Sequence, residues 1–369
     1  MFIKGADVSS LREVESQGGA FYIKGKRKDA LEILQEYGIN SVRLRLWVEP
    51  YDHNGEAYGG GTCDLDTVIE LAKRAKNLGM SFLLDYHYSD FWADPSKQFK
   101  PKSWQNLDYE SLVNKVYEYT KETLKELKNN DVSPEFVQVG NEITAGMLWD
   151  DGKLTWKDDQ VFGFDNLAIL LKAGIKAVRE ICPLCKIMLH LERSADNALY
   201  RQWFDNITAR GVDFDIIGVS YYPYWHGSLD DMQKNLNDII DRYGKEIMVA
   251  ETSYAWTVKG FKQQHDNYVG FAVNNSFKDK APYPFSKRGQ AKFLKDIFNR
   301  IRNLKDNKGL GVYYWEPCWI PTSEGTWASQ SAREYIKETH KGHGNEWANQ
   351  TLFDYKGRVN YALKEYKKF

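Results

Sequence analysis

Residues 136–142 read FVQVGNE, an apolar run typical of a strand that ends abruptly in Gly140, Asn141 and Glu142. A buried strand that carries a carboxylate at its C-terminal tip has this pattern. Residues 247–251, IMVAE, repeat the pattern and end in Glu251. Two strands that each end in a glutamate predict an active site built on a pair of carboxylates.

Working outward from these runs, short apolar segments alternate with amphipathic helices along the whole chain. The expected strands are 3–8, 40–47, 81–85, 136–142, 186–192, 215–222, 245–251 and 309–315. The expected helices are 26–37, 67–77, 109–128, 166–181, 195–210, 229–243 and 286–304, with a short one ending the segment 352–369. This alternation predicts an α/β fold, a (β/α)₈ barrel forming one domain over residues 1–369.

The segments between these elements carry weaker signals. A doubly wound open sheet should show a glycine-rich nucleotide fingerprint after the first strand, and the sequence has none there. We expect a long loop over 257–285 and irregular structure up to residue 350. A second GNE, at 344–346, follows no apolar run and is interpreted as loop.

Carboxylates end five of the expected strands: Asp85, Glu142, Glu192, Glu251 and Glu316. Catalytic groups of a barrel lie at this end, and two glutamates acting as acid and nucleophile suit glycoside hydrolysis. The ionised partner needs a positive charge nearby. Arg43 and Arg45 share one face of their strand, and we expect Arg45 to supply the charge because it lies nearer the tip.

Composition excludes several other classes of function. The chain has 369 residues, a net charge of -1 and 27% charged residues, which does not suit a nucleic-acid binder. The sequence contains no run of eighteen apolar residues, so we expect no membrane span. The start, MFIKGADVSS, lacks the apolar core of a signal peptide. Cys182 and Cys185 form a CxxC without a second pair, so we expect a structural role, such as a local disulfide.

Aromatic residues make up 14% of the chain, and many follow the expected strands. Aromatic faces in a cleft stack on sugar rings, although each of these side chains can also serve as core filler. Asn141 is expected to bind a sugar 2-hydroxyl and Tyr222 to donate to the nucleophile, unless Tyr222 is a core residue. The candidate stacking platforms are Trp92, Trp225, Trp315 and Trp319. Asp85 and His87 are candidate ligands of the reacting sugar, and the alternative for these two is a structural ion pair below the site.

Several longer phrases resemble glycoside hydrolase family 53, the endo-β-1,4-galactanases of clan A, from Phe2 to about Tyr361. They are GADVSS (5–10), LLDYHYSDFWADP (83–95), VQVGNE (137–142), SYYPYWHG (220–227), IMVAETSY (247–254), YYWEPCWIP (313–321) and LFDYKGR (352–358). The resemblance implies that Glu142 is the acid/base and Glu251 the nucleophile. It also implies internal cleavage of β-1,4-galactan, a side chain of pectic rhamnogalacturonan I, with retention of configuration.

The resemblance also bears on metals and cofactors. Some bacterial members of the family hold calcium in the loop after the seventh strand. Here that loop gathers only His265, Asp266 and Asn267, and calcium prefers several carboxylates. We therefore expect no calcium there. His87 and His190 lack the neighbouring histidines of a metal-dependent barrel, so we expect no metal or cofactor in the site.

Three alternatives to a galactanase stay open. They are a clan A enzyme acting on mannan or xylan, a carbohydrate-binding barrel without turnover, and a metal-dependent barrel hydrolase. For the galactanase we expect β-1,4-galactan and galacto-oligosaccharides as partners, no nucleic acid, and a monomer. A polymer substrate cannot enter a cell, so we expect a secreted or cell-surface protein.

Overall fold

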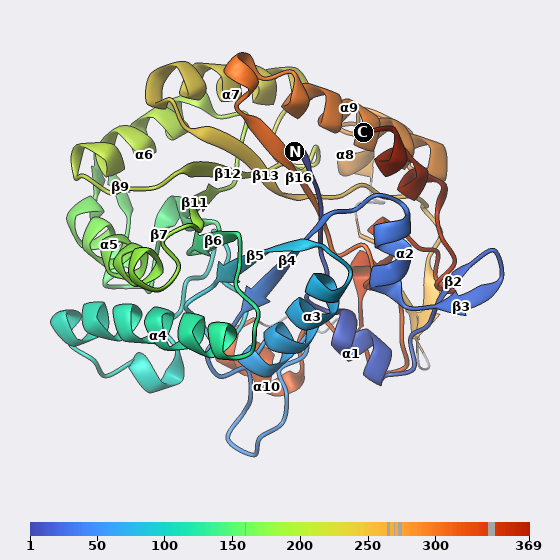
Figure 1. Ribbon diagram of the computed structural model, residues 1–369, viewed down its shortest axis with the longest axis horizontal. Coiled ribbons are helices and arrows are strands. Elements are labelled where there is room, and N and C mark those ends of the chain that lie inside the picture. Colours follow the sequence, from blue (N-terminus) through green and yellow to red (C-terminus); the bar gives the residue numbers. More distant parts are fainter. Residues whose placement is uncertain (159, 264–265, 269, 272–274, 339–343) are drawn as a thin grey trace.

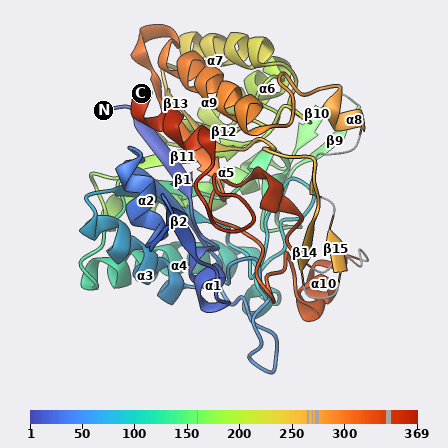
Figure 2. The same ribbon diagram turned by 90° about the vertical axis from the view of Figure 1, so that its right-hand side faces the viewer.

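The computed structural model describes residues 1–158, 160–263, 266–268, 270–271, 275–338 and 344–369. Eight of the described strands close a parallel barrel in sequence order, each hydrogen-bonded to the next. Helices surround the barrel, and the two chain ends lie near each other (Figures 1 and 2). The barrel strands are β1 (Ile3–Asp7), β4 (Ser41–Leu46), β5 (Ser81–Tyr86), β6 (Phe136–Val139), β11 (Lys186–Leu191), β12 (Ile216–Ser220), β13 (Glu246–Thr252) and β16 (Gly309–Trp315). The predicted barrel is therefore confirmed.

Most of the surrounding helices begin where an aspartate or serine accepts a hydrogen bond from a free backbone N–H of the first turn. Asp29, Asp64 and Asp108 cap three of them, and Asp196, Ser228 and Ser286 cap three more. The helices are α1 (Leu11–Ser16), α2 (Ala30–Glu36), α3 (Leu65–Asn77), α4 (Tyr109–Asn129), α5 (Phe164–Ile181), α6 (Asn197–Ala209), α7 (Leu229–Tyr243), α8 (Asn275–Lys278), α9 (Lys287–Arg302) and α10 (Gln330–Ile336). Within the described chain, no helix combines the length and apolarity that crossing a membrane requires.

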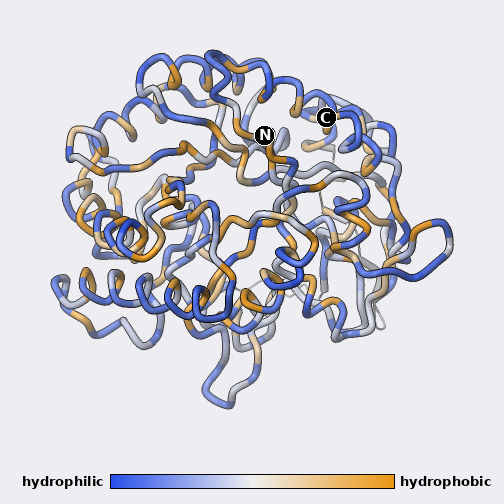
Figure 3. Tube along the Cα trace, in the orientation of Figure 1, coloured by the Kyte–Doolittle hydropathy of each residue, from blue (hydrophilic) through white to orange (hydrophobic). Residues whose placement is uncertain are grey.

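Apolar residues form two layers. The larger core lies between the strands and the helices, whose outer faces are hydrophilic (Figure 3). A smaller cluster fills the inside of the barrel with Leu83, Met188, Ile216, Met248, Ala250 and Tyr313. Gly5 makes room for this plug, since a Cβ there would lie 2.2 Å from the Tyr313 ring. Polar and charged side chains occupy the barrel above the plug, toward the C-terminal strand ends.

Short hairpins and 3₁₀ turns lie in the segments that connect the barrel strands and helices. The hairpins are β2 (Phe21–Ile23) with β3 (Lys26–Lys28), β7 (Gly146–Met147) with β8 (Gly152–Lys153), β9 (Thr155–Lys157) with β10 (Gln160–Phe162), and β14 (Phe261–Gln263) with β15 (Asp266–Tyr268). The 3₁₀ turns are η1 (Lys102–Trp104), η2 (Ile143–Ala145), η3 (Lys305–Asn307), η4 (Glu346–Gln350) and η5 (Tyr361–Lys368).

Three expectations about these segments were wrong. The helix expected over 26–37 begins only at Ala30, because Asp29 caps it and Lys26–Lys28 pairs in β3. The expected loop over 257–285 contains the β14–β15 hairpin and α8, and the segment to residue 350 contains α10 and η4. The short helix expected at the chain end is present as η5, which is of 3₁₀ type. The CxxC forms a disulfide, Cys182–Cys185, between the end of α5 and the start of β11.

Candidate active site

A cleft with a volume of about 300 Å³ lies at the C-terminal ends of the barrel strands. It is the end of the barrel where catalytic groups are found in this fold. Most of the residues singled out from the sequence line it: Arg45, His87, Trp92, Asn141, Glu142, Tyr222, Trp225, Glu251 and Trp315. The fold therefore gathers residues from distant parts of the chain into one site.

Two of the predicted sugar ligands do not line this cleft. Asp85 is fully buried below it, where it pairs with Arg43 at 2.7 Å and with His87 at 3.1 Å. Trp319 is 1% exposed and stacks on Trp327. Asp85 thus forms the ion pair that the sequence left as an alternative, and Trp319 is packing for the aromatic wall.

Glu142 directly follows β6 in a strained backbone conformation. Its φ of 48° lies in the left-handed region, which costs a residue with a side chain about 1 kcal/mol or more. Gly140, with φ of 85°, starts the turn that releases the chain from the sheet. The strained turn aims the Glu142 carboxylate into the cleft, where Ser220 Oγ donates a hydrogen bond of 2.6 Å to its Oε1.

Glu251, on β13, has both carboxylate oxygens held in place. Arg43 lies 2.9 Å from Oε1, and the hydroxyl of Tyr222 donates to Oε2 at 3.1 Å. The sequence predicted this tyrosine contact. A guanidinium and a phenol on the two oxygens stabilise the ionised form and orient the carboxylate.

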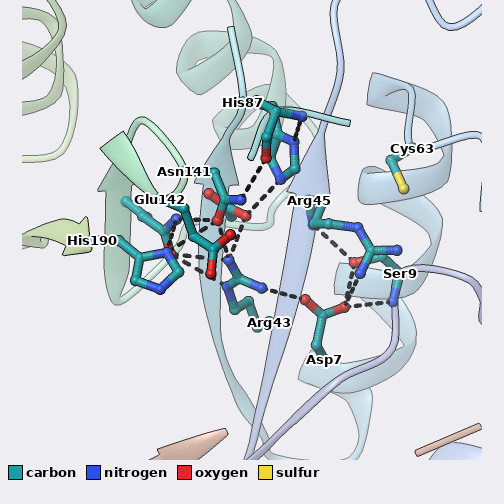
Figure 4. Close-up of polar contacts among 12 residues, drawn as sticks. Asp7, Ser9, Arg43, Arg45, Cys63, His87, Asn141, Glu142 and His190 are labelled. Atoms are coloured by element: carbon teal, nitrogen blue, oxygen red, sulfur yellow. Dashed lines mark hydrogen bonds and ion pairs between the residues drawn. The ribbon is translucent and has the colours of Figure 1, made fainter. Parts of the chain in front are cut away.

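The arginine beside Glu251 is Arg43, so the preference for Arg45 as its cation was wrong. Arg43 is fully buried and contacts Asp7 at 2.7 Å as well as Asp85 and Glu251. Figure 4 shows its guanidinium between Asp7 and the Asn141 side chain, to which it donates at 2.8 Å. A buried guanidinium is costly unless its donors are used, and here carboxylates and amides surround it.

Arg45 instead supports the floor of the cleft. It pairs with Asp7 at 3.0 Å and with Glu316 at 2.6 Å. Its guanidinium carbon lies 4.7 Å from the centre of the Trp92 ring and 5.4 Å from that of Trp315. Cations attract the faces of indole rings, so Arg45 fixes two of the aromatic residues of the cleft.

Two histidines orient the polar groups around the carboxylates. His87 Nδ1 accepts hydrogen bonds from the Trp47 indole and the Ala93 backbone, both at 3.1 Å, so Nε2 carries the proton and donates to Asp85. His190 lies within 3.1 Å of Asn141 and 2.9 Å of Ser220. Burial, followed by the charge of Arg43, lowers the pKa of His190 well below its usual value, which keeps it neutral.

The two glutamates differ in what surrounds their charge. Burial raises the pKa of Glu142 well above its usual value, and the nearby charges of Glu251 and Glu192 raise it further. Burial also raises the pKa of Glu251, but the guanidinium of Arg43 opposes the rise. In the part of the chain that the structure describes, no arginine or lysine pairs with Glu142. Glu142 therefore keeps its proton more readily than Glu251.

Two tryptophans of the cleft wall were not among the predicted residues. Trp327 stacks on Trp92, with ring centres 4.4 Å apart, and the Trp347 ring lies edge-on to Trp315 at 4.9 Å. Both come from the segment expected to be irregular. Trp347 follows the second GNE directly, so an aromatic residue beside a polar loop motif was the available signal.

Glu192, His226 and Asp94 also line the cleft without having been predicted as site residues. Glu192 follows β11 and accepts a hydrogen bond from Thr144. Its position at a strand end was visible in the sequence, but nothing there separated it from the two catalytic candidates. His226 Nδ1 lies 3.0 Å from the carbonyl oxygen of Ser220 and 3.2 Å from the backbone nitrogen of Tyr222.

The described residues contain no group of three or more His, Cys, Asp or Glu side chains suited to a metal ion. The expectation of no calcium after the seventh strand concerns His265, which lies outside the described residues, and Asp266 and Asn267, whose side chains are not described. That expectation stays a prediction. No residue of the cleft is assigned to a cofactor.

The arrangement can carry out acid-assisted displacement at an acetal carbon. One carboxyl group has its pKa raised well above the usual value, a second in the same cleft is bound by a guanidinium and a phenol that favour its ionised form, and tryptophans form flat apolar walls. Such a pair can protonate a leaving oxygen while attacking the carbon that it leaves. Flat walls suit the apolar faces of sugar rings.

Comparisons with known proteins agree with this chemistry. The family model described as Glycosyl hydrolase family 53 matches residues 3–366. An endo-beta-1,4-galactanase of Bacillus subtilis (strain 168) is 40% identical over 384 aligned positions, which cover 99% of this chain and 85% of that protein.

Solved structures show the same likeness in three dimensions. The GH53 catalytic domain of Ignisphaera aggregans superposes with a TM-score of 0.88 at 39% identity, covering 99% of this chain and 95% of that one. A fungal beta-1,4-galactanase structure gives a TM-score of 0.78 at 31% identity, covering 100% of this chain and 99% of that one.

Proposed function

Because the chain belongs to glycosyl hydrolase family 53 and is therefore a glycoside hydrolase, we propose that it cleaves internal β-1,4-galactosidic bonds of galactan with retention of configuration. Relatives named as endo-beta-1,4-galactanases and arabinogalactan endo-beta-1,4-galactanases support the substrate. The observation that carries the mechanism is the pair of glutamates in one cleft, of which Glu251 has both oxygens held by Arg43 and Tyr222.

In the first step, Glu251 attacks the anomeric carbon of a galactosyl residue while Glu142 transfers its proton to the glycosidic oxygen. The bond from the anomeric carbon to that oxygen breaks, and the shortened chain leaves as an alcohol. A galactosyl ester of Glu251 remains. Arg43 and Tyr222 hold the Glu251 carboxylate in position for attack.

In the second step, Glu142, now ionised, takes a proton from a water molecule that attacks the anomeric carbon. The ester bond breaks, Glu251 regains its carboxylate, and the galactosyl residue is released with its original configuration. Esterification of Glu251 removes a negative charge that had raised the pKa of Glu142. The same residue thus changes from an acid to a base between the steps.

The remaining residues of the cleft bind the substrate. Trp92, Trp225 and Trp315 offer ring faces to galactosyl residues, and Asn141 and His87 lie where hydroxyl groups of the reacting sugar would reach. Arg45 acts through the two tryptophans that it contacts. Galactan is a polymer, so the enzyme works outside the cell or at its surface. The proposed enzyme is a monomer.

Product release from galactan, mannan, xylan and cellulose tests this function. We expect galacto-oligosaccharides from the wild type and none from the other three polymers. Glu142→Ala should lose about 10²-fold or more in rate, and Glu251→Ala on the order of 10⁴-fold or more. Glu246→Gln is the matched control, because Glu246 begins the same strand that ends near Glu251 and pairs with Lys186 at the far end of the barrel.

Added azide separates the two roles. In Glu251→Ala an azide ion fills the space of the nucleophile and should yield an α-galactosyl azide, whereas in Glu142→Ala it attacks the galactosyl ester and should yield the β-anomer. The same anomer from both variants would overturn the assignment of roles. Cleavage of mannan or xylan in place of galactan would overturn the proposed substrate and leave the proposed mechanism unchanged.

A further inference from the structure

A second hollow, of about 720 Å³, opens directly beside the catalytic cleft. The two share Pro95 and Glu192 as lining residues, so the hollow continues the cleft. Its other walls include Thr144, Arg193, Asp196 and the indole of Trp156 on β9. The mechanism above uses none of these side chains.

The hollow lies on the acid's side of the site. Thr144 follows Glu142 by two residues, and its hydroxyl donates a hydrogen bond to Glu192. The negative charge of Glu192 raises the pKa of Glu142. Arg43 and Tyr222, which hold Glu251, do not line the hollow. The acid must lie beside the glycosidic oxygen, which departs with the leaving chain. The continuation past Glu142 therefore leads toward the leaving group.

The chemistry of the hollow suits a sugar. Trp156 is 46% exposed, an unusual fraction for a large apolar side chain, and its ring is available for stacking. Arg193 and Asp196 pair at 2.6 Å on the rim, and both are partly exposed. A flat indole beside charged groups that can bond hydroxyls is what a pyranose ring needs.

We propose that this hollow binds the galactosyl residues on the leaving-group side of the scissile bond, with Trp156 as their stacking platform. This inference rests on the proposed function. It assigns the β9–β10 hairpin, an excursion between β6 and α5, to recognition of the reducing-end part of the galactan chain. Glu192 and Thr144 then form the passage between the bond that breaks and the platform.

The hairpin supplies a matched control. Trp156 pairs with Val161 and Thr155 pairs with Phe162, so Trp156 and Phe162 point to opposite faces of the ribbon. Phe162 is 53% exposed and does not line the hollow. Trp156→Ala and Phe162→Ala therefore remove exposed aromatic rings of one hairpin, and equal melting temperatures would show that both variants fold.

The experiment compares kcat/KM on β-1,4-galactohexaose and on 2,4-dinitrophenyl β-1,4-galactobioside, whose leaving group carries no sugar. We expect Trp156→Ala to lose about tenfold on galactohexaose, the size of one aromatic contact of about 1.4 kcal/mol, and less than about twofold on the aryl substrate. Phe162→Ala should match the wild type on both. Cleavage of galactohexaose by Trp156→Ala should also shift toward its reducing end, because fewer residues are held beyond the bond.

Each other result counts against the inference. An unchanged Trp156→Ala, or one that loses equally on both substrates, overturns the role of the hollow and leaves the galactanase intact. A wild type that is inactive on galactohexaose but active on another β-glycan overturns the proposed substrate, and with it the ligand assigned to the hollow.

Discussion

Glu142 lies between two neighbours with opposite effects on its charge. Ser220 donates a hydrogen bond to its carboxylate, which stabilises the ionised form and lowers the pKa of Glu142. The negative charge of Glu192 favours the protonated form and raises that pKa. The acid must be protonated in the first step, so these neighbours adjust the pH above which activity is lost, a pH that burial and the charge of Glu251 already raise.

Removing each neighbour should move the basic limb of the pH profile in opposite directions. Ser220→Ala removes a donor to the ionised form, so the pKa of Glu142 rises and activity persists to higher pH. Glu192→Gln removes a negative charge, so that pKa falls and activity is lost at lower pH. The pH dependence of kcat/KM on galactan measures both, because it reports groups of the free enzyme.

Glu246→Gln, at the far end of the barrel, should leave this profile unchanged. Displacement of the limb in the same direction by Ser220→Ala and Glu192→Gln would contradict the account. The acid limb should respond less in both variants, because Arg43, which opposes the rise in the pKa of Glu251, is untouched.

Individual site residues were predictable where one strand sufficed to place them. Glu142, Asn141 and Glu251 stand at the ends of apolar runs, and their exposure to the cleft follows from the fold. The choice between Arg43 and Arg45 failed because it depends on which carboxylates other strands bring nearby. Asp7 and Asp85 come from β1 and β5, and the spacing within 40–47 contains no information about them.

At the scale of elements, the strands end in backbone that an ordinary residue adopts reluctantly. Tyr88, Glu142, Arg193 and Glu316 follow β5, β6, β11 and β16 with φ between 48° and 57°. Each turns the chain sharply away from the sheet at the catalytic end. At the opposite end, the loops that lead from α4 into β6 and from α9 into β16 also contain left-handed residues, Asp131, Asp306 and Asn307. The disulfide Cys182–Cys185 lies at that end, between α5 and β11.

The disulfide Cys182–Cys185 should add stability without affecting catalysis. It closes a loop of only four residues, for which chain entropy predicts about 2 kcal/mol, or a melting shift of about 2 to 3 °C in a chain of this size. Cys182→Ser/Cys185→Ser should melt lower by that amount and keep full activity on galactan. Calorimetry and product release measure the two effects.

Lower activity in that double variant would show that the start of β11 is coupled to Glu192 at its end. The matched control is Cys63→Ser, which changes a buried cysteine that is not part of a disulfide.

Elements were predictable where hydrophobic periodicity is strong, and most barrel strands and helices fall within a few residues of the expected ranges. The small elements were not. Lys26–Lys28 carries three basic residues and becomes strand β3 only by pairing with Phe21–Ile23. Residues 330–336 form α10 because Ser329 caps them, in a stretch with little apolar repetition.

For the whole molecule, we expect stability and activity that do not depend on calcium. The loop after β13 gathers one aspartate beside His265, and calcium sites require several carboxylate or carbonyl oxygens. Melting and galactan cleavage should therefore be the same before and after treatment with a chelator. Added calcium after treatment is the control, and a large fall in melting temperature that calcium restores would contradict the prediction.

The closure of the barrel through β1 links catalysis to the completion of the chain. β1 pairs with β16, more than three hundred residues later, and Asp7 at its end pairs with both buried arginines. Contacts between such distant segments form late in folding, since the intervening chain must first be ordered. A ribosome-bound nascent chain that lacks the last strand would have all of Glu142, Glu251 and Arg43 but an open barrel. The closed site therefore requires the last strand of the chain, because β1, which carries Asp7, is held on one side by β16.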